Sequence, residues 1–111
     1  MKCKDKVALV TGAASGSGGR AAVRLAMEGA KLFLMDVNEA GLEKTAEEIR
    51  LFGGQAIACP CDVSSEIAVK AAVAQAVEAF GRIDILVNNY GSTDVKVDFD
   101  LLNGDTDSFF K

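Results

Sequence analysis

The sequence has 111 residues and is 50% apolar, which is enough for one domain with a buried core and excludes a disordered chain. Its 12 basic and 16 acidic residues give a net charge of −4, and because Lys and Arg form no dense patch, we expect no nucleic acid partner. The longest apolar runs are far shorter than the ~20 residues of a membrane span and no signal-peptide pattern is present, so we expect no membrane partner and a cytoplasmic location.

Short apolar runs alternate with segments of helical periodicity along residues 1–91. The runs predict strands at residues 6–11, 31–36, 55–59 and 84–88. A helix is predicted after each of the first three strands, with Asn38 capping the second and Ser64 or Ser65 capping the third. Apolar strands that alternate with amphipathic helices indicate a parallel sheet covered on both faces. The sequence therefore predicts a doubly wound α/β fold of about four strands.

Residues 92–111 form a different segment. They are acidic, carry Phe99, Phe109 and Phe110, and show no clear periodicity beyond a short helical pattern at residues 105–111. We assign this segment no firm structure and treat it as separate from the βα units of residues 1–91.

The three cysteines, Cys3, Cys59 and Cys61, are an odd number in a chain without an export signal. A tetrahedral metal site needs four ligands, but the chain has no His and no second cysteine pair. We therefore predict reduced, partly buried thiols and no metal site.

A glycine-rich turn joins the first strand to the first helix. Gly12 permits a tight turn, Gly16 lets backbone N–H groups approach a pyrophosphate, and Gly18 lets the helix and strand pack closely. The N-terminus of a helix favours a bound phosphate, so this turn predicts a dinucleotide site in a Rossmann-type fold. The absence of a Gly-Lys-Ser/Thr sequence argues against a nucleoside triphosphate loop.

Asp36 ends the second strand, 24 residues after Gly12. A carboxylate there can accept both hydroxyls of an adenosine ribose and would repel a 2′-phosphate. Neither Ser15 nor Val37 supplies a cation for such a phosphate. These residues favour NAD over NADP.

The glycine turn, Asp36, the Asp62–Val63 pair after the third strand and the Asn88–Asn89 turn after the fourth resemble the short-chain dehydrogenase/reductase family in order and spacing. The resemblance covers about residues 4–91. It implies that Asp62 and Val63 lie at the adenine, and that Asn88 and Asn89 support the central strand and touch the nicotinamide-side ribose. The predicted cofactor-binding residues are Gly12, Ser15, Gly16, Ser17, Gly18, Asp36, Asp62, Val63, Asn88 and Asn89.

Two positions depart from the family pattern. Tyr90 replaces the alanine of the Asn-Asn-Ala-Gly turn, where a phenol could stack against the cofactor or block its ribose. Ser17 replaces the usual Ile or Leu.

The family's proton-transfer residues are a Tyr, a Lys four residues later, a Ser and an Asn, and none of them can be placed in this sequence. Tyr90 is the only tyrosine, and Asp94 lies four residues after it. A carboxylate there would raise the pKa of a phenol, so Tyr90 is not predicted to be a general base. The resemblance therefore implies the NAD-binding N-terminal half of an oxidoreductase. An alcohol or carbonyl substrate would bind only if the catalytic half is supplied.

Three alternatives remain at this point. The chain could be a non-catalytic NAD-binding or interaction module, an S-adenosylmethionine methyltransferase, or a nonfunctional truncated fragment. The apolar strand at residues 85–87 would lie at the sheet edge, and an unpaired edge of this kind favours self-association.

Overall fold

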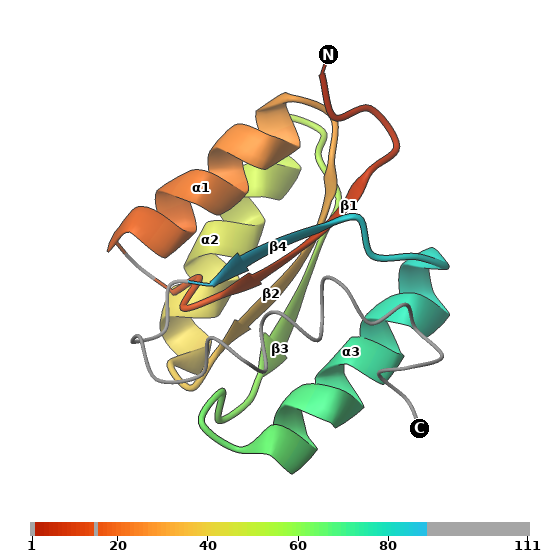
Figure 1. The fold of residues 1–111 in the computed structure, drawn as a ribbon. Coiled ribbons are helices and arrows are strands. Elements are labelled where there is room, and N and C mark those ends of the chain that lie inside the picture. The colour runs from red at the N-terminus through yellow and green to blue at the C-terminus, as the bar shows by residue number, and fades with distance from the viewer. Residues whose placement is uncertain (1, 15, 89–111) are drawn as a thin grey trace.

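The computed structural model describes residues 2–14 and 16–88. Strands and helices alternate through this region, as predicted (Figure 1). In chain order the elements are β1 (Val7–Thr11), α1 (Gly16–Met27), β2 (Lys31–Asp36), α2 (Glu39–Leu51), β3 (Ala56–Pro60), α3 (Glu66–Phe80) and β4 (Ile85–Asn88). The segment at residues 92–111 lies outside the described residues.

The four strands form one parallel sheet in the order β3-β2-β1-β4. Helices α1 and α2 cover one face and α3 covers the other (Figure 1). The predicted doubly wound α/β fold is therefore confirmed. From β1 the chain moves outward to β2 and β3 and then returns to place β4 on the other side of β1. The order reverses at β1, and ligands of such sheets bind outside the carboxyl ends of the strands at this point.

The core has one cluster on each face of the sheet. Along β1 and β2, alternate side chains point to opposite faces, as strand geometry requires. Val10 and Leu34 pack under α1 and α2, whereas Leu9 and Phe33 pack under α3. Both faces are covered, which is why these central strands read as continuous apolar runs.

The helix ends are set by local hydrogen bonds. The side chain of Asn38 accepts a hydrogen bond from the Gly41 amide at 3.0 Å, so Asn38 caps α2 as predicted. The structure resolves the choice for α3: the cap is Ser65, whose hydroxyl accepts from the Ala68 amide at 3.2 Å.

The start of β4 is fixed to the start of β1 by Asp84. One carboxylate oxygen accepts a hydrogen bond from the Val7 amide at 2.8 Å, and the other accepts from the guanidinium of Arg82 at 2.6 Å. Burial raises the pKa of Asp84, but the two donors outweigh burial and hold this pKa below its usual range. The ionised carboxylate thus holds β4 in register beside β1.

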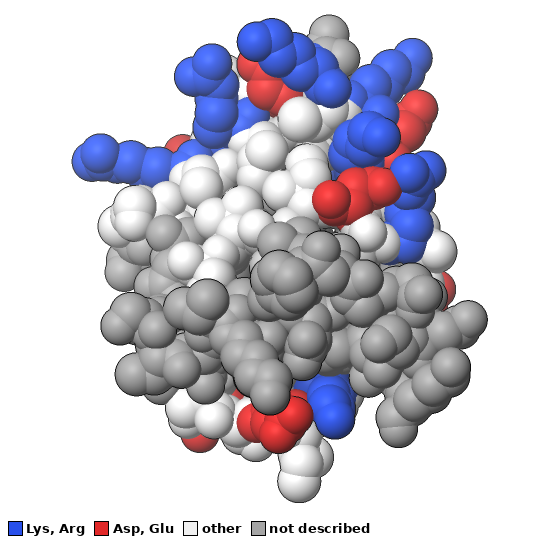
Figure 2. Space-filling model, in the orientation of Figure 1, with Lys and Arg blue, Asp and Glu red and all other residues white. Residues whose placement is uncertain are grey.

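Charged side chains of both signs lie together on the surface. Lys and Arg gather along the upper edge of the face drawn in Figure 2, and Asp and Glu lie among them. Within the described residues, no helix is long and apolar enough to cross a membrane.

Candidate functional site

The glycine turn lies at the carboxyl edge of the sheet, where the strand order reverses. Gly12 and Gly16 have φ angles of 65° and 62°, a left-handed conformation that costs glycine little. A Cβ atom at Gly18 would lie 2.0 Å from the carbonyl oxygen of Gly12. Helix α1 therefore begins in close contact with the turn, and its first amide groups are directed to the edge where a ligand would bind.

Helix α2 holds the other side of this turn. The hydroxyl of Thr45 donates a hydrogen bond to the carbonyl oxygen of Ala13 at 2.9 Å. A Cβ atom at Gly41 would lie 2.8 Å from the Cβ of Ala14, so this position also requires glycine. The sequence analysis missed both residues, although a threonine beside the apolar stripe of α2 is a detectable signal for a buried hydroxyl contact.

Asp36 lies beside the turn, at the end of β2. Its Oδ2 accepts a hydrogen bond from the Ala14 amide at 3.1 Å, and its Oδ1 accepts from the Asn38 amide at 3.0 Å. These bonds fix the orientation of the carboxylate. Each carboxylate oxygen can accept more than one hydrogen bond, so Asp36 keeps capacity for the hydroxyls of a ligand. The neighbouring Val37 is 68% exposed and brings no charge.

Asp62 and Val63 reach the same edge from β3. The Cys61 amide donates to the carbonyl oxygen of Asp36 at 2.9 Å and so joins the ends of β3 and β2. Asp62 is exposed and accepts hydrogen bonds from the hydroxyl and the amide of Ser64, which lower the pKa of its carboxyl group. Val63 is half-buried against the cluster under α3.

Asn88 ends β4 at the same edge. The hydroxyl of Thr11 donates to Oδ1 of Asn88 at 2.7 Å, and the two residues are paired in register. Ser17 is exposed in the first turn of α1. The structure thus brings Gly12, Gly16, Ser17, Gly18, Asp36, Asp62, Val63 and Asn88 to the carboxyl ends of the strands. Ser15 and Asn89, together with the substituted Tyr90, lie outside the described residues.

The cysteines are free thiols. Cys59 and Cys61 are half-buried and pack against the cluster under α3. Burial raises the pKa of the Cys59 thiol and, together with the neighbouring Cys59, raises the pKa of Cys61 to about 11. Residues 2–14 and 16–88 contain no group of three or more His, Cys, Asp or Glu side chains that could hold a metal ion.

The carboxyl edge therefore combines backbone amides at a helix start with an oriented carboxylate at the end of the neighbouring strand. Amides and a helix dipole stabilise an anion, and the carboxylate accepts hydroxyl groups. This arrangement can hold and orient a molecule that has both an anionic group and hydroxyl groups. No pair of described residues at this edge forms a general acid and base.

Comparison with known proteins gives a consistent match. A family model described as short chain dehydrogenase matches residues 6–111. The short-chain reductase protein NovJ of Streptomyces niveus is 49% identical over 88 residues, which are 79% of this chain and 34% of that protein. The chain therefore spans about a third of the length of the curated relatives it matches.

Solved structures share the fold as well. A structure of NAD⁺-bound xylitol dehydrogenase has a TM-score of 0.79 and 44% identity, and the match covers 83% of this chain and 35% of that one. A metagenomic short-chain oxidoreductase in complex with NADP has a TM-score of 0.78 and 36% identity, with 83% of this chain and 42% of that one covered.

Proposed function

The chain belongs to the short-chain dehydrogenase family, and from this premise we propose that it is the NAD-binding part of an oxidoreductase that acts on an alcohol or a carbonyl compound. The observation that carries the proposal is the Asp36 carboxylate, oriented by the Ala14 and Asn38 amides beside the glycine turn. The family assignment also speaks against a methyltransferase, which the sequence alone had left open.

The choice of NAD rests on charge. The two solved structures named above hold NAD⁺ and NADP respectively, so the family does not decide between them. A negative carboxylate within reach of the ribose would repel a 2′-phosphate, and the exposed Val37 beside it offers no cation. Both features favour NAD.

Each part of the cofactor has a proposed position along the carboxyl edge. The pyrophosphate lies on the glycine turn and the start of α1, and Asp36 accepts the adenosine ribose hydroxyls. The adenine lies by Asp62 and Val63, and the nicotinamide-side ribose lies near the end of β4. The residues assigned to the pyrophosphate are Gly12, Ser15, Gly16, Ser17 and Gly18, and those assigned to the nicotinamide side are Asn88 and Asn89.

In the mechanism that follows, the described residues bind and orient. The nicotinamide ring, when bound, accepts or donates the hydride. The turn would hold the phosphates and Asp36 would hold the adenosine ribose, and together they would orient the nicotinamide end of the cofactor. Proton transfer to or from the substrate is not assigned to any described residue.

Titration of the purified chain with NADH, with circular dichroism to confirm folding, tests this proposal. We expect NADH to bind more tightly than NADPH. Asp36→Ala should weaken NADH binding about tenfold or more, since a hydrogen bond to a charged group contributes ~1.5–3 kcal/mol. Asp36→Asn removes the charge but keeps one acceptor oxygen, so it should reduce the difference in affinity between NADH and NADPH.

Glu47→Ala is the matched control, because it removes an exposed carboxylate from α2 away from the turn. It should leave both affinities unchanged. Equal NADH binding by folded Asp36→Ala and the parent would refute the role of Asp36. A folded parent that ignores NADH would refute the NAD-binding function, whereas binding without turnover would match the non-catalytic module considered from the sequence.

A further inference from the structure

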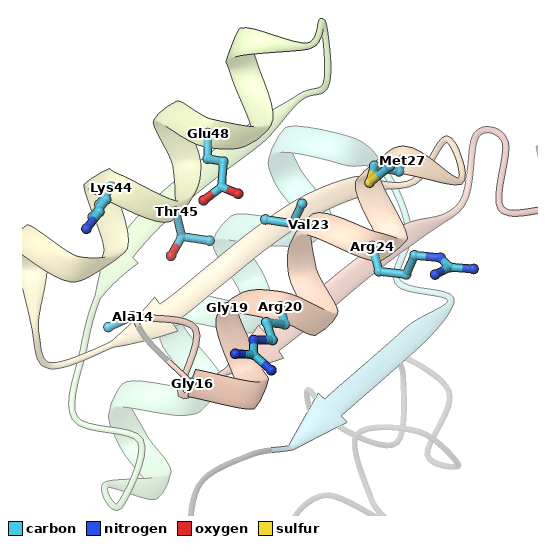
Figure 3. Close-up of a pocket in the computed structure, with 10 residues that line it drawn as sticks. All are labelled: Ala14, Gly16, Gly19, Arg20, Val23, Arg24, Met27, Lys44, Thr45 and Glu48. Atoms are coloured by element: carbon cyan, nitrogen blue, oxygen red, sulfur yellow. The ribbon is translucent and has the colours of Figure 1, made fainter.

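A groove of 430 Å³ runs between α1 and α2 on the outer side of the helical layer. One end is formed by Ala14 and Gly16, the back of the glycine turn, and the other by Met27 at the end of α1 (Figure 3). Asp36, Asp62 and Asn88 do not line it. The groove is therefore separate from the carboxyl edge assigned to NAD, although the two share the turn. Its volume lies in the range of small-molecule sites.

The lining of the groove is basic in an acidic protein. It contains three cations, Arg20, Arg24 and Lys44, but only one carboxylate, Glu48. Arg24 pairs with Glu28 at 3.6 Å outside the lining. Among the described residues, neither Arg20 nor Lys44 has an ion-pair partner. These two cations come from different helices, and Figure 3 shows both nearer to the turn than Met27.

The remaining walls of the groove are largely apolar. Val23 lies between the helices, and Met27 is 57% exposed, so both side chains offer apolar surface to a ligand in the groove. A ligand that suits this lining combines an apolar body with an anionic group.

We propose that the groove between α1 and α2 binds an organic phosphate monoester, with its phosphate between Arg20 and Lys44 and its apolar body along Val23 and Met27. Arg20 and Lys44 together carry two positive charges, which match the dianion that a phosphate monoester forms above its second pKa of ~6. Guanidinium and ammonium groups both donate strong, charge-assisted hydrogen bonds to phosphate oxygens. The site is additional to the cofactor site and does not depend on whether NAD binds.

The experiment is calorimetric titration of the full chain with 1-naphthyl phosphate at pH 8, with inorganic phosphate and 1-naphthol as partial ligands. We expect the parent to bind 1-naphthyl phosphate at least tenfold more tightly than either partial ligand. Arg20→Gln and Lys44→Gln should each weaken binding of 1-naphthyl phosphate about fivefold to tenfold. Glu48→Gln removes the one carboxylate of the lining and should strengthen it.

Lys70→Gln is the control, since it removes an exposed lysine from α3 on the opposite face and should change nothing. All substituted residues are exposed, and circular dichroism verifies that the variants fold. Binding that persists in saturating NADH and responds to Arg20 and Lys44 supports the proposal. No binding by the folded parent, equal binding by all variants, or displacement by NADH overturns it; displacement would assign the phosphate to the cofactor edge.

Discussion

At the scale of single residues, the hydroxyl of Thr45 links α2 to the glycine turn. Thr45 is 7% exposed and donates to the carbonyl oxygen of Ala13 at 2.9 Å. We predict that Thr45→Val, which has nearly the same shape but no hydroxyl, lowers the free energy of unfolding by ~1–3 kcal/mol because a buried acceptor loses its donor. Urea denaturation measures this change. NADH affinity should fall too, because the turn loses a support.

Thr45→Ser separates the hydroxyl from the methyl group. It keeps the donor, so it should retain NADH affinity even where the lost methyl reduces stability. If the Ser and Val variants lose NADH affinity equally, the hydrogen bond does not position the turn.

The burial of Cys61 gives a prediction about pH. Its pKa is raised to about 11, and the thiolate is the reactive form. We expect Cys61 to react slowly with iodoacetamide at pH 8 and its rate to keep rising, about tenfold per pH unit, up to pH 10. Mass spectrometry of the labelled peptide measures this rate. In urea the rate should instead level off above the usual thiol pKa of ~8.5.

The same shift couples to stability. The folded chain holds the Cys61 proton more tightly than the unfolded chain, which ionises first as the pH rises. The contribution of this thiol to the free energy of unfolding is therefore complete below pH ~8.5 and is lost as the pH rises toward about 11. A native labelling rate that levels off near pH 8.5 would contradict this account.

Asp36 and Thr45 show how far single residues could be predicted. Asp36 could be placed beside the glycine turn because parallel strands end at the same edge of a sheet. The contact between Thr45 and Ala13 depends on how α2 is rotated and how closely it approaches the turn. That approach is permitted by Gly41 against Ala14 and is a tertiary property that periodicity does not contain.

At the scale of elements, the start of α1 contrasts two adjacent glycines. A Cβ atom at Gly18 would lie 2.0 Å from the carbonyl oxygen of Gly12, which is a severe clash. A Cβ atom at Gly19 would lie 3.4 Å from the carbonyl oxygen of Ala13, which is an ordinary contact. We predict that Gly18→Ala destabilises the fold by ~3 kcal/mol or abolishes NADH binding by displacing the helix. Gly19→Ala should be neutral or stabilising by up to ~1 kcal/mol, because alanine favours helix.

Thermal denaturation and NADH titration of both variants measure the contrast. Equal effects of the two substitutions would show that helix propensity, not the close approach at Gly18, governs this turn.

The elements themselves followed from periodicity, since each predicted strand agrees with the observed one to within a residue. The cap of α3 did not, because Ser64 and Ser65 are chemically equivalent as caps. In the structure Ser64 instead donates to Asp62, which leaves Ser65 to accept from Ala68. The choice was set by a neighbouring carboxylate.

At the scale of the whole molecule, the edge strand β4 differs from the central strand β1. In β1 every residue is buried, but all four residues of β4 are only half-buried. Within the described part of the chain, β4 pairs with β1 alone. An apolar edge strand of this kind is a template for pairing with another chain. We propose self-association of the 111-residue chain through this edge, as the sequence suggested.

Analytical ultracentrifugation over a range of concentrations tests this edge. We predict that the average mass of the parent rises with concentration and that Leu86→Lys, which places a charge on β4, keeps the chain monomeric. Ile67→Lys is the matched control, because Ile67 is 83% exposed on α3 and lies away from the edge. If Ile67→Lys rather than Leu86→Lys prevents association, exposed apolar surface on α3 drives it, since edge pairing depends on β4 and not on that helix.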